Sequence, residues 1–216
     1  SPSDIPPESW ITAPREARTW YAPRYAPEMR PLETQIGRFR RNSAMFVVGA
    51  YRPVSPAAES EGAETPEWDT QRGWEFGLEG QPHAALFLIP EDGSEPMFVR
   101  GTDVEGVLTI DSPPGRYVSG LEVVDLQGRQ AWRARQGVVQ LPLVPGLIDA
   151  SDLLILKEGA PLPASLDDAI RHVRPGVRIR KGERFPVVWE TYGLRIAEPV
   201  RVTLGFTSGR PGFLTR

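Results

Sequence analysis

The segment Ser43-Ala-Met-Phe-Val-Val-Gly-Ala-Tyr51 decides the fold of this chain of 216 residues. Its apolar side chains fill odd and even positions alike, so a strand over this segment is apolar on both of its faces. Valine, phenylalanine and tyrosine also favour the pleated geometry of a sheet. Strands with two apolar faces lie in the middle of a folded domain, so this segment is predicted to be a central β-strand.

Further short strands, separated by turn signals, follow this segment along the chain. Asp92-Gly93 is a strong hairpin signal, and Gly128 supplies the positive φ that a second hairpin turn needs. Regular short strands of this kind predict a mostly β fold, with an Ig-like antiparallel β-sandwich over residues 35–158. The expected strands are His83–Ile89, Met97–Arg100, Glu105–Asp111, Gly115–Asp125, Arg129–Gln136, Val138–Leu143 and Leu153–Lys157.

A linker and a smaller β unit are expected after the sandwich. The linker covers residues 159–175 and contains a short helix, with Ser165 as its N-cap and Pro175-Gly176 as its end. Alternating apolar side chains then predict a small second β-sheet within residues 176–216. Three strands are too few to stand alone, so this sheet must dock on the sandwich or be covered by a partner. Its expected strands are Val177–Lys181, Phe185–Thr191 and Val200–Phe206.

The N-terminal residues 1–34 form the third unit that the sequence indicates. Seven prolines in this segment prevent regular helix or sheet pairing, so it is predicted to be an extended arm. Tryptophan and tyrosine side chains lie between the prolines, and such large apolar surfaces pack on their own domain or on a partner. The sequence starts at Ser1 without a methionine, as expected if a leader has been removed or the chain has been trimmed. The residues expected to make contacts are Trp10, Arg15, Trp20, Tyr21, Arg24 and Tyr25.

Composition and charge exclude several classes of function. A net charge of −3 argues against a general nucleic-acid binder, and no apolar run approaches the roughly 20 residues of a transmembrane helix. The chain has no cysteine, which removes disulfides, thiolate catalysis and cysteine-bound metals. Charge is unevenly distributed, with a long acidic loop over residues 53–82 and a basic excess after Arg171. These regions are either solvated faces or electrostatic docking patches.

No motif for catalysis or for cofactor binding stands out, and no cofactor is expected. Asp149 and Asp152 form a carboxylate pair that would suit a hydrolase, although their place at a loop-to-strand junction also gives them a structural explanation. A hydrolase is only the third hypothesis, and binding of a carbohydrate or another small ligand ranks before it, because tryptophans outside the expected strands would offer a stacking platform. These tryptophans are Trp10, Trp20, Trp68 and Trp74, and protein contacts within the chain or with a partner explain them equally well.

Three segments resemble the C-terminal β-rich region of bacterial GWxTD-domain proteins, namely Arg30–Arg41, Ser151–Leu156 and Val187–Leu194. The resemblance spans roughly residues 30–206, but the signature itself is not matched by Gly73-Trp74-Glu75-Phe76-Gly77. The resemblance implies a family whose members are mostly exported and have no established enzymatic activity. Because the signature is not matched, residues 30–206 are expected to serve a function other than that of the family.

The sequence therefore predicts a non-enzymatic structural protein that holds other protein subunits together. The expected setting is periplasmic or otherwise extracytoplasmic, as an extrinsic subunit that braces a membrane-associated assembly. A photosynthetic reaction-centre and light-harvesting complex is one candidate, on architecture alone. Besides the six residues of the arm, the residues expected to bind partners are Trp68, Trp74, Arg178, Arg180 and Arg201.

Overall fold

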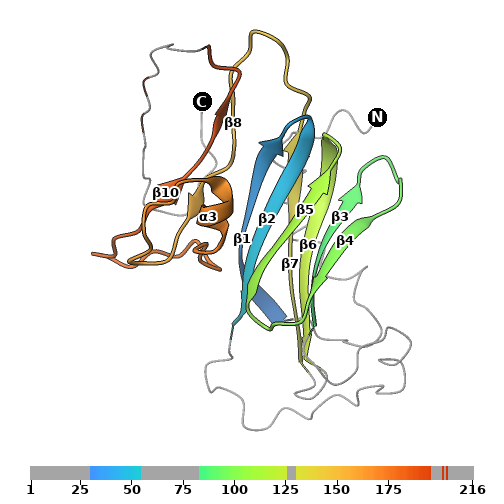
Figure 1. The fold of residues 1–216 in the computed structure, drawn as a ribbon. Coiled ribbons are helices and arrows are strands. Elements are labelled where there is room, and N and C mark those ends of the chain that lie inside the picture. The colour runs from blue at the N-terminus through green and yellow to red at the C-terminus, as the bar shows by residue number, and fades with distance from the viewer. Residues whose placement is uncertain (1–29, 55–82, 126–129, 196–200, 202, 204–216) are drawn as a thin grey trace, which may run out of the picture.

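The computed structural model describes residues 30–54, 83–125, 130–195, 201 and 203, and it is mostly β (Figure 1). Seven longer strands form one sheet, and four short strands pair two by two near the C-terminal end of the described chain. The strands are β1 (Arg30–Arg41), β2 (Ala44–Pro53), β3 (His83–Pro90), β4 (Met97–Gly101), β5 (Gly106–Ser112), β6 (Gly115–Asp125), β7 (Gln130–Gln140), β8 (Asp149–Ala150), β9 (Leu154–Ile155), β10 (Val187–Val188) and β11 (Thr191–Tyr192), and the helix is α3 (Leu166–Ile170).

The seven-stranded sheet folds into two layers at β1. Its strand order is β4-β3-β6-β7-β1-β2-β5, but β1 pairs with β7 only at Arg30 and Pro31. From Leu32 to Arg41, β1 instead pairs with β2 in antiparallel register. The chain therefore crosses from the layer of β4, β3, β6 and β7 to the layer of β1, β2 and β5 (Figure 1). The predicted sandwich is confirmed, and its pairing is antiparallel except at the two-residue parallel contact.

The central strand has the two buried faces that its sequence predicts. Met45, Val47 and Tyr51 on β2 point between the layers, where they pack with side chains of β3, β6 and β7. Phe46 and Val48 point the other way and are also buried, at 3% and 0% exposure. They are covered by a second cluster that includes Leu154, Leu156, Ala169 and Val173 from the C-terminal part of the chain. Strand β2 therefore holds both cores together.

Several local predictions agree with the structure. The first hairpin turn has Gly93 at φ 79°, and the second joins β6 to β7 in continuous antiparallel register. Ser165 caps α3, because its side-chain oxygen accepts a hydrogen bond from the amide of Asp168 at 3.2 Å. The helix ends at Ile170, a few residues before the expected end, and Gly128 lies outside the described residues.

The predicted boundary of the N-terminal arm is wrong by five residues. Residues 30–34 belong to β1, because their backbone finds partners on β7 and β2 that the sequence pattern does not reveal. Pro31 is tolerated there because it stands at the beginning of the strand, where its missing N–H costs little. Residues 1–29 of the arm and 55–82 of the acidic loop lie outside the described residues.

The second sheet is also organised differently from the prediction. Residues 177–181 form no strand, and Val177 and Ile179 are 60% and 42% exposed. Within the predicted strand Phe185–Thr191, β10 pairs with β9, whereas β11 begins at Thr191 and pairs with β8. Leu153–Lys157, expected to complete the sandwich, thus pairs with the C-terminal segment. Alternation predicts a strand's faces but not its partner, and that choice is made by tertiary contacts. Of the predicted strand Val200–Phe206, only Arg201 and Thr203 are described.

Candidate interaction surfaces

The connector, defined as residues 141–148 between β7 and β8, is the first candidate surface. It contains no charged residue, and five of its side chains are large, aliphatic and at least 41% exposed. The predicted strands Arg129–Gln136 and Val138–Leu143 are one continuous strand, β7, which ends at Gln140 because Pro142 cannot donate to a strand ladder. The exposed side chains are Leu141, Leu143, Val144, Leu147 and Ile148, and Leu153 lies exposed shortly beyond them.

A defined turn shapes the backbone of the connector. The amide of Leu147 donates to the carbonyl of Val144 at 3.0 Å across Pro145 and Gly146. Gly146 has φ +82°, which is the left-handed conformation that a type II turn requires at this position after a proline. Gly193 packs against the backbone of the connector, since a Cβ added to it would be 2.2 Å from the carbonyl oxygen of Leu147.

Arg40 on β1 anchors both ends of the connector. Its guanidinium donates to the carbonyl of Leu141 at 2.6 Å and to Asp149 Oδ2 at 2.6 and 3.0 Å. The backbone amide of Arg40 also donates a hydrogen bond to the hydroxyl oxygen of Tyr192, at 2.9 Å. Ordered backbone beneath exposed apolar side chains is the character of a docking surface, because little conformational entropy is lost on binding.

The carboxylate pair considered for hydrolysis is engaged in these anchoring contacts. Burial alone would raise the pKa of Asp149, but hydrogen bonds from Arg40 and Ala150, together with the charges of Arg38 and Arg40, lower it. The Asp152 carboxylate accepts the amide of Arg38 at 2.9 Å. Loss of solvent around that carboxyl raises the pKa of Asp152, and this effect outweighs the charge of Arg38, which lowers it. The side chain nevertheless stays 47% exposed. These contacts give both aspartates a structural role.

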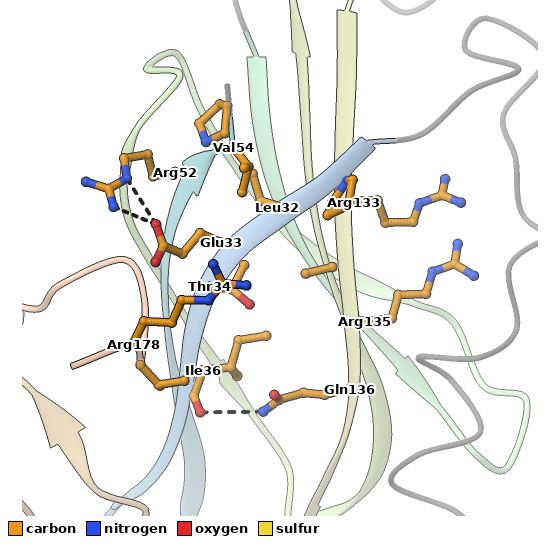
Figure 2. Close-up of a pocket in the computed structure, with 14 residues that line it drawn as sticks. Leu32, Glu33, Thr34, Ile36, Arg52, Val54, Arg133, Arg135, Gln136 and Arg178 are labelled. Carbon is orange, nitrogen blue, oxygen red and sulfur yellow. Dashed lines mark hydrogen bonds and ion pairs between the residues drawn. The ribbon is translucent and has the colours of Figure 1, made fainter. Parts of the chain in front are cut away.

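The β1–β7 groove is the second candidate surface and has a volume of about 770 Å³ (Figure 2). It opens where β1 leaves β7 after Pro31 and turns toward β2. Leu32, Ile36 and Ala134 contribute apolar surface, and the side chain of Gln136 spans the opening to the carbonyl of Ile36 at 3.5 Å. The other lining residues are Pro31, Glu33, Thr34, Arg52, Pro53, Val54, Arg133, Arg135, Val177 and Arg178.

Arginines dominate the charge around this groove. Arg52 donates to Glu33 at 2.5 and 3.2 Å. This hydrogen bond is the main reason that the pKa of Arg52 is raised; burial lowers the pKa, and the charge of Glu33 raises it. Arg133 and Arg135 extend from β7 and lie 2.7 and 3.8 Å from Glu122. Arg178, from the C-terminal part, extends over β1 toward the groove (Figure 2). Arg133 and Arg135 point away from β1, so Arg52, which is paired with Glu33, and Arg178 are the guanidinium groups on the β1 side of the groove (Figure 2).

The structure brings only part of the predicted partner-binding set together. Arg178 lines the groove, whereas Arg180 and Arg201 are exposed elsewhere on the C-terminal part. The connector was not predicted as a site. Its signal in the sequence is an uncharged run over residues 136–148, which contains Pro145-Gly146 and ends just before an aspartate. Outside the described residues lie Trp10, Arg15, Trp20, Tyr21, Arg24, Tyr25, Trp68 and Trp74.

Two tryptophans lie within the described residues, and neither forms an open platform. Trp132 is 5% exposed and belongs to the core between the layers, as its alternation with polar neighbours predicts. Trp189 is half-buried between β10 and β11. The predicted stacking platform consists of the four tryptophans outside the described residues, so the carbohydrate hypothesis stays a prediction.

Comparison with protein-family profiles, with curated proteins and with solved structures finds no match for this chain. The resemblance to GWxTD-domain proteins therefore stays a prediction. Among the described residues, no helix has the length and apolarity to cross a membrane. The same part of the chain holds no cluster of three or more histidine, aspartate or glutamate side chains suited to a metal ion.

Proposed function

We propose that this protein is a non-enzymatic interaction subunit that holds other protein subunits together. The observation that carries the proposal is the connector, whose five large aliphatic side chains are exposed above an anchored backbone. Contiguous exposed apolar patches mark sites of interaction with proteins or membranes, or ligand-binding grooves, and we take the first of these roles for the connector. A few side chains near the centre of such a patch supply most of the binding free energy when a partner covers it.

The proposed partners are subunits of a membrane-associated assembly on its extracytoplasmic side. A reaction-centre and light-harvesting complex remains one candidate for this assembly. The aromatic arm is proposed as a second contact, through Trp10, Trp20, Tyr21 and Tyr25 with their neighbouring arginines. Extended arms contact large areas of a partner, at the cost of the entropy lost on ordering.

The test is co-purification of the tagged full chain from its native membranes in mild detergent, with stoichiometry determined by mass spectrometry. The double variant Leu147→Asn/Ile148→Asn removes two exposed aliphatic side chains of 59% and 58% exposure from the connector. Since burial of each such side chain contributes about 1.5–3 kcal/mol, we expect the affinity for the partner to fall by at least about a hundredfold.

Leu162→Asn is the matched control, because Leu162 is an 86% exposed leucine outside the connector. We expect this variant to co-purify with the same partner at unchanged stoichiometry. A stoichiometric complex that survives the double variant would remove the connector from the interface. A chain that purifies alone under all conditions would contradict the interaction function itself.

Deletion of the arm must stop at residue 29, because Arg30 and Pro31 pair with β7. The variant lacking residues 1–29 is expected to fold, with an unchanged β-rich circular dichroism spectrum, and to lose the assembly. Retention of the complete assembly by this folded variant would exclude the arm as an anchor. The connector variants would then decide alone whether the chain is an interaction subunit.

A further inference from the structure

Strand β5 forms an open edge of the sandwich. It stands at one end of the strand order, and its neighbour within the described residues is β2, in continuous register from Gly106 to Ser112. Natural edge strands are commonly protected by lysine, proline or a bulge, and β5 has none of these. Every residue from Gly106 to Ile110 is partly exposed. The side of β5 that faces away from β2 is therefore accessible.

The strand register identifies the backbone groups that this edge leaves unpaired. In an antiparallel ladder, alternate residues direct both backbone polar groups away from the neighbouring strand. On β1 these are the even-numbered residues, because the amide of Arg38 donates to Asp152. Through the pairs of β1 with β2 and of β2 with β5, the corresponding residues of β5 are odd-numbered. Their N–H and C=O groups have no hydrogen-bond partner in the part of the chain that the structure describes. These residues are Val107, Thr109 and Asp111.

The layer that contains β5 is one strand narrower than the layer that it faces. Four strands, β4, β3, β6 and β7, form one described layer, and β1, β2 and β5 form the other (Figure 1). Leu108 of β5 lies across from the end of β4, since a Cβ added to Gly101 would be 3.0 Å from its Cδ2. Met97 and Val99 of β4 point between the layers but stay partly exposed, whereas the leucines of β3 that pair with them are 0% exposed. A strand added to β5 would cover Met97 and Val99.

The charges along this edge are acidic. Residues 103–111 contain Asp103, Glu105 and Asp111 and no basic residue. Asp111 is exposed and makes no ion pair with any residue that the structure describes. A second copy of the chain would bring the same acids to the edge, and like charges on paired strands repel each other. A segment with lysine or arginine is attracted instead.

We propose that the outer edge of β5 binds an extended segment of a partner protein, which pairs antiparallel with Val107, Thr109 and Asp111. Apolar side chains of that segment cover Met97 and Val99, and basic side chains on its opposite face lie beside Asp111. Peptides that add a strand to an open edge gain affinity from main-chain hydrogen bonds and specificity from alternate side chains.

This inference rests on the proposed interaction function and names the chemistry of one partner segment. It also extends the surface of the connector, because Asp111 at the end of β5 and Leu143 of the connector line the same hollow of about 900 Å³. One partner can therefore contact both.

The test measures fluorescence anisotropy of a labelled nine-residue peptide of alternating lysine and valine, titrated with the full chain. We expect saturable binding that is at least tenfold tighter than binding of the glutamate–valine peptide of the same length. Equal binding of the basic and acidic peptides, or no saturation at about millimolar concentration, would overturn the proposal.

N-methylated peptides test the main-chain pairing directly. In an antiparallel pair that exchanges both hydrogen bonds, the two opposite side chains lie on the same face of the sheet. The lysine residues that face Asp111 therefore direct their N–H groups toward β5, and the valine residues direct theirs away. We expect N-methylation of the lysine residues to weaken binding at least tenfold and that of the valine residues less than threefold. Full binding of the peptide with methylated lysine residues would overturn the pairing.

Thr109→Pro is the decisive variant, because it removes an N–H that points away from β2. Proline is tolerated at such positions of edge strands, so the circular dichroism spectrum should stay unchanged. We expect at least a tenfold loss of peptide binding, and full affinity of the folded variant would overturn the site.

Asp111→Lys tests the charge at the edge and does not depend on the proline variant. Glu158→Lys is its control, with the same charge change at an exposed position outside β5. We expect at least a tenfold loss for Asp111→Lys and less than a twofold change for the control. Equal losses would mean that only net charge matters and would overturn the site.

A second copy of the chain is the competing occupant, and sedimentation velocity of the full chain tests it. A dimer that is lost in Thr109→Pro and that the basic peptide dissociates would assign the edge to that copy and overturn the partner proposal. The connector variant Leu147→Asn/Ile148→Asn should bind the peptide normally. Failure of the peptide to bind while co-purification stays intact would overturn this inference and leave the interaction function standing.

Discussion

The side-chain amide of Gln35 pairs with both backbone polar groups of Ile155. Its Oε1 accepts the amide of Ile155 at 2.6 Å, and its Nε2 donates to the carbonyl of Ile155 at 2.9 Å and to the carbonyl of Arg174 at 2.9 Å. Gln35 is 3% exposed, so these bonds are made away from water. The side chain of Gln35 thereby makes the backbone hydrogen bonds that a neighbouring strand would make, and it joins the C-terminal part to the sandwich.

Gln35→Leu should destabilise the protein by about 1–3 kcal/mol, because it leaves the amide of Ile155 without its acceptor and removes a donor from the carbonyls of Ile155 and Arg174. The carbonyl of Ile155 keeps the amide of Arg174 as a donor at 3.1 Å. Chemical denaturation with a β-sheet signal measures the free energy of unfolding. Gln136→Leu is the comparison variant, since the hydrogen bond from Gln136 to the carbonyl of Ile36 is long, at 3.5 Å, and we expect its cost to be the smaller of the two. Equal costs for the two variants would show that the hydrogen bonds to Ile155 add no more to the free energy of unfolding than the bond of Gln136 does.

Gly193→Ala tests how closely the connector is seated. Gly193 has φ +79°, and its added Cβ would collide with the carbonyl oxygen of Leu147. Gly182→Ala carries the same backbone penalty, of about 1 kcal/mol at φ +86°, but its Cβ would meet nothing within 4 Å. We therefore expect Gly193→Ala to lower the free energy of unfolding by at least about 1 kcal/mol more than Gly182→Ala does. Similar costs would mean that the connector is free to move away.

The pair of Arg40 and Asp149 should make the stability depend on acid. The pKa of Asp149 is lowered in the folded protein, so its contribution is complete above the unfolded value of about 3.9 and is lost as the pH falls through the folded value. Asp149→Asn should cost about 1–2 kcal/mol at pH 7, and the cost should shrink below about pH 4. Thermal melts across this range measure it.

Glu158→Gln is the control for this titration, because Glu158 is exposed and has no ion pair among the described residues. We expect its unfolding temperature to follow that of the unmodified chain at every pH. A cost of Asp149→Asn that stays constant down to pH 3 would show that the hydrogen bonds survive protonation. The charge of Asp149 would then have no part in anchoring the connector.

The sequence predicts the strands of the sandwich well because their apolar patterns are local. Gly115–Asp125 coincides with β6, and the two apolar faces of Ser43–Tyr51 correspond to the two buried faces of β2. Strand β1 is harder to predict, since Arg38 and Arg40 interrupt its apolar pattern. Their partners, the carbonyl of Val139 and the carboxylate of Asp149, lie about a hundred residues further along the chain.

The candidate surfaces are only partly readable from the sequence for a related reason. A short apolar run looks the same whether it is buried or exposed, so the connector resembles the end of a strand. Its exposure follows from the turn at Pro145-Gly146 and from the anchoring by Arg40. The basic excess and the alternation of the expected second sheet predict Arg178 as a contact residue, but its position beside β1 depends on how the C-terminal part docks.

Val47 and Val48 offer the most direct test of the two cores, because each is 0% exposed and they point to opposite faces of β2. Val47→Ala opens a cavity between the sandwich layers, whereas Val48→Ala opens one beneath Leu154 and Leu156. We expect each to cost about 1–3 kcal/mol in denaturant unfolding, against less than about 0.5 kcal/mol for Val177→Ala at a 60% exposed position. A negligible cost for Val48→Ala alone would mean that the C-terminal part does not cover the outer face of β2 in solution.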